Sequence, residues 1–387
     1  MMGKVQHSAQ RVKEFARSYT SGLKPGDVRR LFDQDASRVY AVLARDHAGE
    51  PEPSGRARRF FHRARIVFLG LSYKLTPARR ILFAVALLLA FVGLLEVNSG
   101  GHVVIGPGNP FLLFSSILAF VYLLALELAD RVLIRDELEV ARQLQHDLLP
   151  SRSPSVPGYA FAHSYRTANE VGGDYYDFPL LADGRLVIVA GDASGHGMAA
   201  GLVMAIANAT LNVAMDLDPR PARVAAILNR TLWHTGTRRN FMSLFYGILD
   251  PATGALEYLC AGHPFPLLLR AGGELLELGK GGFPLGVRET LEPATASVTL
   301  SPGDRLLIHS DGLPESRNAR GEVFGYDRLA DLLKTGGGAQ EIHDRILRAL
   351  DAFRADEPLV DDVSLVVVAR QSPAATPPPP PTSPAAP

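Results

Sequence analysis

Residues 185–200 read RLVIVAGDASGHGMAA, and this pattern decides the fold of the second half of the chain. An apolar run is followed by GDASGHG, which places the carboxylate of Asp192, the hydroxyl of Ser194 and the imidazole of His196 within five residues. These groups could form a nucleophile with its base, a metal site, or a tight turn of small polar residues. The surrounding sequence decides which of these three interpretations applies.

An apolar run that ends in a turn recurs throughout residues 159–370. Turn pairs such as Thr253-Gly254 and Gly272-Gly273 separate many of the runs, which are rich in β-branched and aromatic residues. The strand candidates are RLVIVAGD, SLFYGILD, ALEYLCAG, PFPLLLR, ASVTLS, DRLLIHSD and VSLVVVAR, and helical patterns cover residues 198–215, 221–234, 326–333 and 339–353. Since tight turns join consecutive strands into antiparallel hairpins, the sequence predicts an α+β domain and not a doubly wound parallel sheet.

Two apolar runs precede this domain, ILFAVALLLAFVGLLEV from Ile81 and FLLFSSILAFVYLLALELADRVLI from Phe111. Each has about fifteen strictly apolar residues, fewer than the roughly 18 of a typical membrane helix. Arginines flank the outer ends of both runs, whereas the loop between them, NSGGHVVIGPGN, has no lysine or arginine. The positive-inside rule therefore predicts a two-helix transmembrane hairpin over residues 78–134, with both ends in the cytoplasm. The alternative is a buried helical hairpin of a soluble domain.

The segments around the hairpin and the domain have simpler patterns. Residues 1–75 are polar and arginine-rich, and no function is assigned to them. The second apolar run continues without glycine or proline to Leu149, so residues 135–150 are expected to form a linker helix. Its apolar stripe favours a coiled-coil homodimer, although the stripe could instead pack on the following domain. Residues 371–387 form a proline-rich tail that we expect to be disordered.

The amino-acid composition argues against a nucleic-acid-binding protein and against a cysteine-based site. The 387 residues suffice for two domains, and the 40 basic and 40 acidic side chains cancel. The one dense basic stretch lies between Arg56 and Arg80, next to an apolar run, which suits a membrane flank and not a nucleic-acid surface. Nucleic acid is therefore not expected as a partner. Cys260 is the single cysteine, which excludes an intramolecular disulfide and a cysteine-rich metal site.

Aspartates recur at the ends of the apolar strands. Asp192 follows LVIVAG, Asp311 follows RLLIHS, Asp361 and Asp362 precede VSLVVVA, and Asp174 lies in VGGDYYDF. Aspartate is a poor strand residue, and an unpaired buried carboxylate is costly. Several of them at strand ends indicate carboxylates that converge on a hard cation such as magnesium or manganese, and not on zinc.

Five motifs follow one another along the domain: EVGGDYYDF, GDASGHGMAA, AGHPFPLLL, SDGLPESRNARGEVFG and DDVSLVVV. In this order and spacing they resemble the metal-dependent serine/threonine phosphatases of the protein phosphatase 2C (PPM) type. The bacterial SpoIIE-type branch, whose members control sigma-factor switches, is the most similar. The stretch ELEVARQLQHDLLP also resembles the helix that precedes the catalytic domain in that branch, so the resemblance covers about residues 138–370.

The resemblance implies two packed antiparallel sheets flanked by helices, and two divalent cations, Mn²⁺ or Mg²⁺. Asp192 matches the aspartate that bridges both metals, and the backbone carbonyl of Ala193 matches the ligand beside it. Asp311 and Asp361 match ligands of the other ion, and Asp174 matches the remaining carboxylate.

Asp177 and Asp362 are secondary candidates, and His196 is a catalytic candidate together with Asp192 and Asp311. Asp177 lies three positions after Asp174, and residues three apart in an extended segment face opposite sides. Asp362 alternates away from Asp361 in the same way. His196 has two interpretations, a general acid for the leaving seryl or threonyl oxygen, or a polar residue in the turn before the next helix.

The resemblance implies a phosphatase that hydrolyses phosphoserine or phosphothreonine on a regulatory protein similar to an anti-sigma-factor antagonist, by attack of a metal-bridging water. With the hairpin, it implies a multi-pass protein of the bacterial inner membrane whose phosphatase domain is cytoplasmic. One alternative is a phosphatase-fold regulator with little or no turnover that acts through partner binding. Another is a serine hydrolase based on Ser194, which is disfavoured because Gly191-Asp192-Ala193-Ser194-Gly195 is not the G-x-S-x-G nucleophile elbow.

Overall fold

A computed structural model describes residues 43–44, 55–97, 103–106, 108–195, 197–235 and 240–372. Most of residues 1–75, nearly all of the proline-rich tail and His196 therefore lie outside the described residues. The contacts divide the chain into two units, residues 1–132 and residues 133–387, and each is described by itself.

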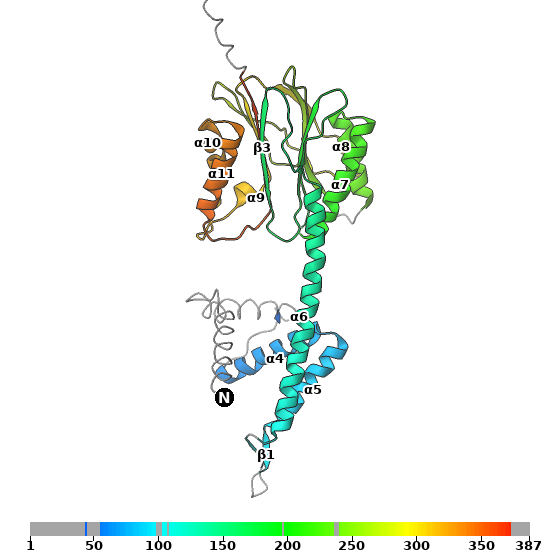
Figure 1. Ribbon diagram of the computed structural model, residues 1–387, viewed down its shortest axis with the longest axis vertical. Helices are drawn as coiled ribbons and strands as arrows, with labels where there is room; N and C mark the ends of the chain where they lie inside the picture. Colours follow the sequence, from blue (N-terminus) through cyan, green and yellow to red (C-terminus); the bar gives the residue numbers. More distant parts are fainter. Residues whose placement is uncertain are drawn as a thin grey trace, which may run out of the picture. The chain divides into compact units, whose positions relative to one another are not determined.

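The first unit contains a helical hairpin that follows a basic helix (Figure 1). Its elements are α4 (Arg56–Lys74), α5 (Pro77–Gly93), the short strands β1 (Leu95–Val97) and β2 (Val103–Ile105), and the first part of α6 (Pro110–Asp147). Strands β1 and β2 pair antiparallel at the tip of the hairpin, where the sequence analysis predicts a loop.

Helices α5 and α6 run antiparallel in a register that three contacts define. Ser116 Oγ donates a hydrogen bond to the carbonyl of Ala86 (2.8 Å). The rings of Phe83 and Phe120 lie 6.0 Å apart. Toward the end of the hairpin away from β1 and β2, the Arg79 guanidinium pairs with Asp130 (2.6 Å) and Glu127 (3.3 Å). The predicted pairing of two apolar helices is therefore present.

The hairpin exposes many large apolar side chains, including Leu88, Phe91, Phe111 and Ile117. Contiguous apolar surface of this kind is rare on soluble proteins and marks an interaction with a membrane or a partner. By length and composition, α6 and α7 (Met198–Leu217) are the described helices that could cross a membrane, whereas α5 has only 17 residues. Helix α7 belongs to the core of the second unit, since its inward face is buried against the neighbouring sheet.

The second unit consists of two five-stranded antiparallel sheets with helices on both outer faces (Figure 1). One sheet has the order β10–β7–β6–β5–β4 and the other β3–β12–β11–β8–β9. The strands are β3 (Tyr159–Arg166), β4 (Asp174–Asp177), β5 (Leu186–Ala193), β6 (Met242–Leu249), β7 (Ala255–Ala261), β8 (Leu267–Leu269), β9 (Leu275–Glu277), β10 (Thr295–Thr299), β11 (Arg305–His309) and β12 (Val363–Arg370). The predicted α+β class with two antiparallel sheets is confirmed.

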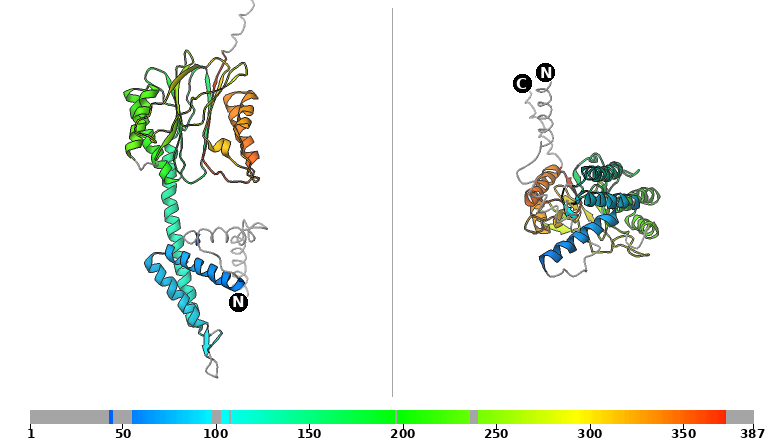
Figure 2. Two further views of the ribbon diagram at one scale, coloured as in Figure 1. Left: turned by 180° about the vertical axis from the view of Figure 1, so that it is seen from behind. Right: turned by 90° about the horizontal axis from the view of Figure 1, so that it is seen from below.

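Helices α7 and α8 (Pro221–Thr235) cover the first sheet, and α10 (Tyr326–Lys334) and α11 (Ala339–Arg354) cover the second (Figures 1 and 2). Strand β12 shows why two layers of core form. Val366 and Val368 face the other sheet, while the alternating Leu365 and Val367 pack in a separate cluster with α10 and α11. All four predicted helices of this domain are present. Strands β3, β4 and β9 and the one-turn helix α9 (Gly312–Glu315) were not predicted.

Candidate functional site

Two of the predicted aspartates face each other on neighbouring strands. Strands β4 and β5 pair antiparallel with Asp174 directly opposite Asp192. Side chains of directly opposed residues lie on the same face of a sheet, about 5 Å apart at Cβ, and like charges in that position repel. Asp174 is 1% exposed. The sheet therefore holds two carboxylates together at a buried point where they destabilise each other.

The second sheet contributes the other carboxylates. Asp311 follows β11 at the position just before the short helix α9, and Asp361 and Asp362 come directly before β12, the neighbouring antiparallel strand. Asp311, Asp361 and Asp362 all lie close enough to Asp192 to raise the pKa of its carboxyl by charge repulsion. The candidate site is therefore assembled from the ends of both sheets.

Asp362 connects the two sheets directly. Its carboxylate is buried and accepts hydrogen bonds from the backbone N–H groups of Ala168 (2.8 Å) and Gly173 (2.6 Å). Asp361 is exposed, and its carboxylate accepts a bond from the N–H of Asp362 (2.8 Å). The expected alternation of the two side chains holds, but it is Asp362 that points into the protein beside Asp174.

A glycine pair lets the backbone pass between these groups. A Cβ at Gly172 would lie 2.2 Å from the Asp362 carboxylate, and one at Gly173 would lie 2.7 Å from the carbonyl oxygen of Ala193 and 2.9 Å from Asp192 Oδ1. The Ala193 carbonyl and the Asp192 carboxylate thus lie close to the same point of the chain. Any side chain at residue 172 or 173 would displace them.

The carboxyl groups at this point have strongly perturbed pKa values. Burial, followed by repulsion from Asp311, Asp361 and Asp362, raises the pKa of Asp192 to about 8. Burial and the facing Asp192 raise the pKa of Asp174 well above its ordinary value, and the Ser310 and Ser364 hydroxyls offset this only in part. Burial and the neighbouring Asp361 also raise the pKa of Asp311. Each of these shifts means that the carboxyl holds a proton, or a cation in its place, more readily than an exposed aspartate does.

The donor set fits a hard cation. Asp174 Oδ2 is buried and, within the described part of the chain, has no hydrogen-bond partner. In that same part, no three Asp, Glu, His or Cys side chains form a cluster that could by themselves hold an ion. Magnesium usually binds through one or two carboxylates and keeps several waters, so a carboxylate pair with a backbone carbonyl suits it.

The other residues of the predicted set lie elsewhere. The Asp177 carboxylate accepts hydrogen bonds from the N–H of Phe178 (2.7 Å) and the hydroxyl of Tyr175 (3.3 Å), neither of which belongs to the carboxylate cluster. The Ser194 hydroxyl accepts a bond from the N–H of Phe241 (2.9 Å), in keeping with a turn residue. His196 lies outside the described residues.

Gln145, at the end of α6, was missed by the sequence analysis. Its side chain is buried, and its amide bonds both the carbonyl (2.6 Å) and the N–H (2.9 Å) of Gly172. The end of the linker helix is thus hydrogen-bonded to the residue before Gly173. The only signal in the sequence is one polar residue next to the apolar stripe of that helix.

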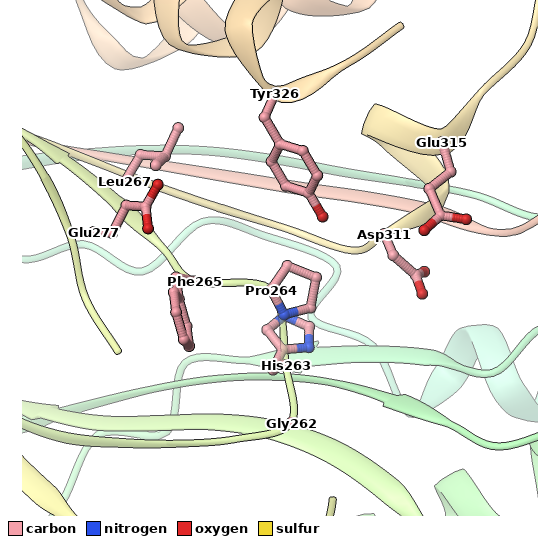
Figure 3. A pocket seen from close by; sticks show the side chains of 9 residues that line it. All are labelled: Gly262, His263, Pro264, Phe265, Leu267, Glu277, Asp311, Glu315 and Tyr326. Atoms are coloured by element: carbon pink, nitrogen blue, oxygen red, sulfur yellow. The ribbon is translucent and has the colours of Figure 1, made fainter. Parts of the chain in front are cut away.

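A cleft of about 490 Å³ adjoins Asp311 (Figure 3). The Tyr326 ring extends into it, with Glu277 on one side and Glu315 and Asp311 on the other (Figure 3). Burial raises the pKa of Tyr326, and repulsion from these same three carboxylates adds to the shift. The lining contains no lysine or arginine among its described residues. The cleft therefore has a negative potential and aromatic walls.

Buried His263 also lines the cleft. Its Nδ1 bonds the Ser243 hydroxyl (2.9 Å), which in turn accepts a bond from the N–H of Asp192 (3.2 Å). Burial lowers the pKa of His263 to about 3, so its ring is neutral and helps to fix the backbone at Asp192.

The chain is similar to several known proteins. The family model described as "Stage II sporulation protein E (SpoIIE)" matches residues 182–371. Protein IcfG from Synechocystis sp. is 28% identical over 276 residues, which cover 64% of this chain and 43% of that protein. Phosphoserine phosphatase RsbU from Bacillus subtilis is 26% identical over 241 residues, 62% of this chain and 71% of that protein. This chain thus spans less than half the length of the first of these relatives.

Among solved structures, the SiaA-PP2C domain of Pseudomonas aeruginosa superposes with a TM-score of 0.56 at 23% identity. The match covers 63% of this chain and 99% of that domain, and it shows that the two have the same fold.

Proposed function

Because the chain belongs, through residues 182–371, to the SpoIIE family of PP2C-type bacterial serine phosphatases, we propose that it is a membrane-anchored, metal-dependent protein serine/threonine phosphatase. Its substrate is a phosphorylated regulatory protein similar to an anti-sigma-factor antagonist. The observation that carries the metal-dependent mechanism is the pair of buried Asp174 and half-buried Asp192, which lie opposite each other, with one oxygen of Asp174 unpartnered among the described residues.

The proposed cofactors are two divalent cations, Mn²⁺ or Mg²⁺. When bound, such ions activate water at neutral pH and neutralise charge on a transferring phosphoryl group. Asp174, Asp192 and the Ala193 carbonyl would hold one ion, with Asp192 shared, and Asp311 and Asp361 would hold the other. Asp362 keeps the Gly173 backbone in place through its hydrogen bond and is a positioning residue.

The cleft beside Asp311 would receive the residues that flank the phosphoserine. Its three carboxylates and two aromatic side chains favour a basic residue, since a cation is attracted both by carboxylates and by the face of an aromatic ring. We therefore expect better turnover of phosphopeptides with a lysine or arginine near the phosphorylated residue.

The proposed organisation follows the predicted boundaries. Residues 78–134 would span the bacterial inner membrane twice, residues 135–150 would form the linker helix and a homodimer contact, and residues 159–370 would form the cytoplasmic phosphatase domain. The antiparallel, apolar and exposed α5–α6 hairpin supports the membrane assignment.

Phosphopeptide hydrolysis by residues 133–387 tests the enzymatic proposal. We expect activity with Mn²⁺, none with EDTA, a loss with Asp311→Asn, and retention with Ser194→Ala. Activity that persists in EDTA and disappears in Ser194→Ala would contradict the mechanism. A fold that binds Mn²⁺ without any turnover would instead indicate a regulator that acts through partner binding.

A further inference from the structure

Helix α4 has an unusual charge. Its 19 residues, RARRFFHRARIVFLGLSYK, contain five arginines, one lysine and no acidic residue. Besides Tyr73, the same helix carries four exposed large apolar side chains, Phe60, Phe61, Phe68 and Leu71. Phe60 and Phe61 are 69% and 71% exposed, which is unfavourable in water.

The apolar side chains form one stripe. At about 100° per residue, Phe60, Leu71, Phe68 and Phe61 fall within roughly a 100° arc of the helix. Four of the arginines flank this arc within roughly 60° of its edges; Arg56 and Arg63 are on one side, and Arg58 and Arg65 are on the other, whereas Arg59 lies nearly opposite the stripe. An apolar stripe bordered on both sides by long cationic side chains is typical of helices that lie in a membrane interface.

The opposite side of α4 is where it contacts protein. Ile66 and Gly70 are buried on that side, and a Cβ at Gly70 would lie 2.6 Å from the carbonyl oxygen of Leu43. At one edge of the stripe, the rings of Phe68 and Phe83 of α5 stack 5.8 Å apart. Within the described part of this unit, the stripe is therefore mainly a surface of α4 that protein contacts leave exposed.

The direction of α4 is also that expected of a helix that lies in a membrane interface. In the view of Figure 1 and in the view from below in Figure 2, α4 extends to the side of the α5–α6 pair and does not run along it. Helix α4 joins α5 at the end that carries Arg79 and Arg80, the end the positive-inside rule places in the cytoplasm. If α5 and α6 cross a bilayer, α4 lies near the plane of its cytoplasmic surface.

We propose that α4 is an interfacial helix that binds the anionic phospholipids of the cytoplasmic leaflet. Phe60, Phe61, Phe68 and Leu71 enter the boundary between headgroups and acyl chains, and the flanking arginines contact lipid phosphates. Each basic residue near an anionic surface strengthens such binding several-fold. This inference rests on the membrane part of the proposed function and is independent of the phosphatase activity.

A tryptophan placed on the stripe tests the inference. The full chain, with the native Trp233→Phe, is reconstituted into nanodiscs of phosphatidylcholine with and without about 30% phosphatidylglycerol. Phe61→Trp should be quenched at least about twofold by lipids brominated on the acyl chains and shielded from aqueous iodide. The matched control is Tyr73→Trp, since Tyr73 is 65% exposed but lies about 170° from the centre of the stripe. It should be quenched by iodide and not by bromolipid.

A third reporter separates the two proposals. Ile117→Trp on α6, where the native side chain is 61% exposed, should be quenched by bromolipid in every disc if the hairpin spans the bilayer. Quenching at residue 117 without quenching at residue 61 would overturn the inference on α4 alone. An absence of bromolipid quenching at residue 117 would overturn both the transmembrane hairpin and the inference on α4. Shielding of residue 61 by added DNA or RNA, without lipid quenching, would also overturn it.

A further pair of variants tests whether binding to anionic lipid requires the arginines of α4. Changing Arg56, Arg58 and Arg59 to glutamine should abolish the difference in residue 61 quenching between anionic and neutral discs. Three exposed arginines of the phosphatase domain changed in the same way, Arg223, Arg230 and Arg348, should leave it intact. An unchanged difference in the first variant would show that the arginines do not bind lipid.

Discussion

Replacing Asp192 with asparagine should change how the stability of the metal-free domain depends on pH. In EDTA, the buried Asp192 has a pKa of about 8, compared with an ordinary value of 3.8. The native state then keeps a proton that the unfolded chain has already lost. A carboxyl with a raised native pKa stabilises the fold fully below pH 3.8, and this contribution disappears as the pH rises through 8. The asparagine side chain of the variant has no proton to lose in this range.

The clearest window lies between pH 6.5 and 8. Below it, buried His263 and His309, with pKa values of about 3 and about 4, produce the opposite slope because the unfolded chain takes up their protons first. Within the window, one proton held by the native state changes the free energy of unfolding by up to about 1.4 kcal/mol per pH unit. Since Asp192 is half protonated at pH 8, the total decrease is roughly 1.5 kcal/mol. Asp174 changes stability in the same direction.

Urea unfolding of residues 133–387 in EDTA, at several pH values, measures this decrease. The wild-type domain should lose stability from pH 6.5 to 8 and regain it with Mn²⁺, since ligation replaces the proton. Asp192→Asn should flatten the profile and abolish the effect of Mn²⁺, whereas Asp177→Asn, on the other face of β4, should retain both. A flat wild-type profile in EDTA, or an unchanged slope in Asp192→Asn, would refute the assignment of a buried carboxylate pair.

Three substitutions test neighbouring parts of the site. Gln145→Ala leaves the N–H and carbonyl of Gly172 without partners, so urea unfolding should show a loss of about 2 kcal/mol or more; no loss would mean that the contact is dispensable. Gly173→Ala should reduce phosphopeptide turnover about 100-fold because its Cβ displaces the Ala193 carbonyl, whereas Gly272→Ala, in open space, should not. Glu315→Gln should raise the KM for a phosphopeptide with a basic flank about two- to fivefold relative to one with an acidic flank, and equal changes in both KM values would argue against the cleft as the binding site.

Much of the phosphatase fold could be predicted because its strands have strong local signals. Strand β5 and its neighbours are continuous apolar runs that end in glycine turns, and α7 and α11 have clear helical periodicity. Strand β4 was missed because DYYD has the composition of a polar loop. Its strand conformation depends on pairing with β5, which is a long-range contact that local patterns do not encode.

The sequence predicts the carboxylates of the candidate site but not the hydrogen bonds that position them. Asp192 and Asp311 stood out because aspartate at the end of an apolar strand is unfavourable without a partner. The inward position of Asp362 depends on two backbone N–H groups, of Ala168 and Gly173, that are almost 200 residues away in sequence. No pattern around residue 362 could reveal them.

The division of the carboxylates between the two sheets has a mechanical consequence. Asp174 and Asp192 belong to one sheet, and Asp311 and Asp361 flank strands of the other, so the site lies at the boundary between two layers that share a hydrophobic core. A small sliding of one layer against the other would separate the two halves without breaking a strand pair in either. The bond between the Gly173 N–H and Asp362 crosses that boundary. A ligand or partner that shifts one layer slightly along the other would therefore disturb the site while every strand pair remains.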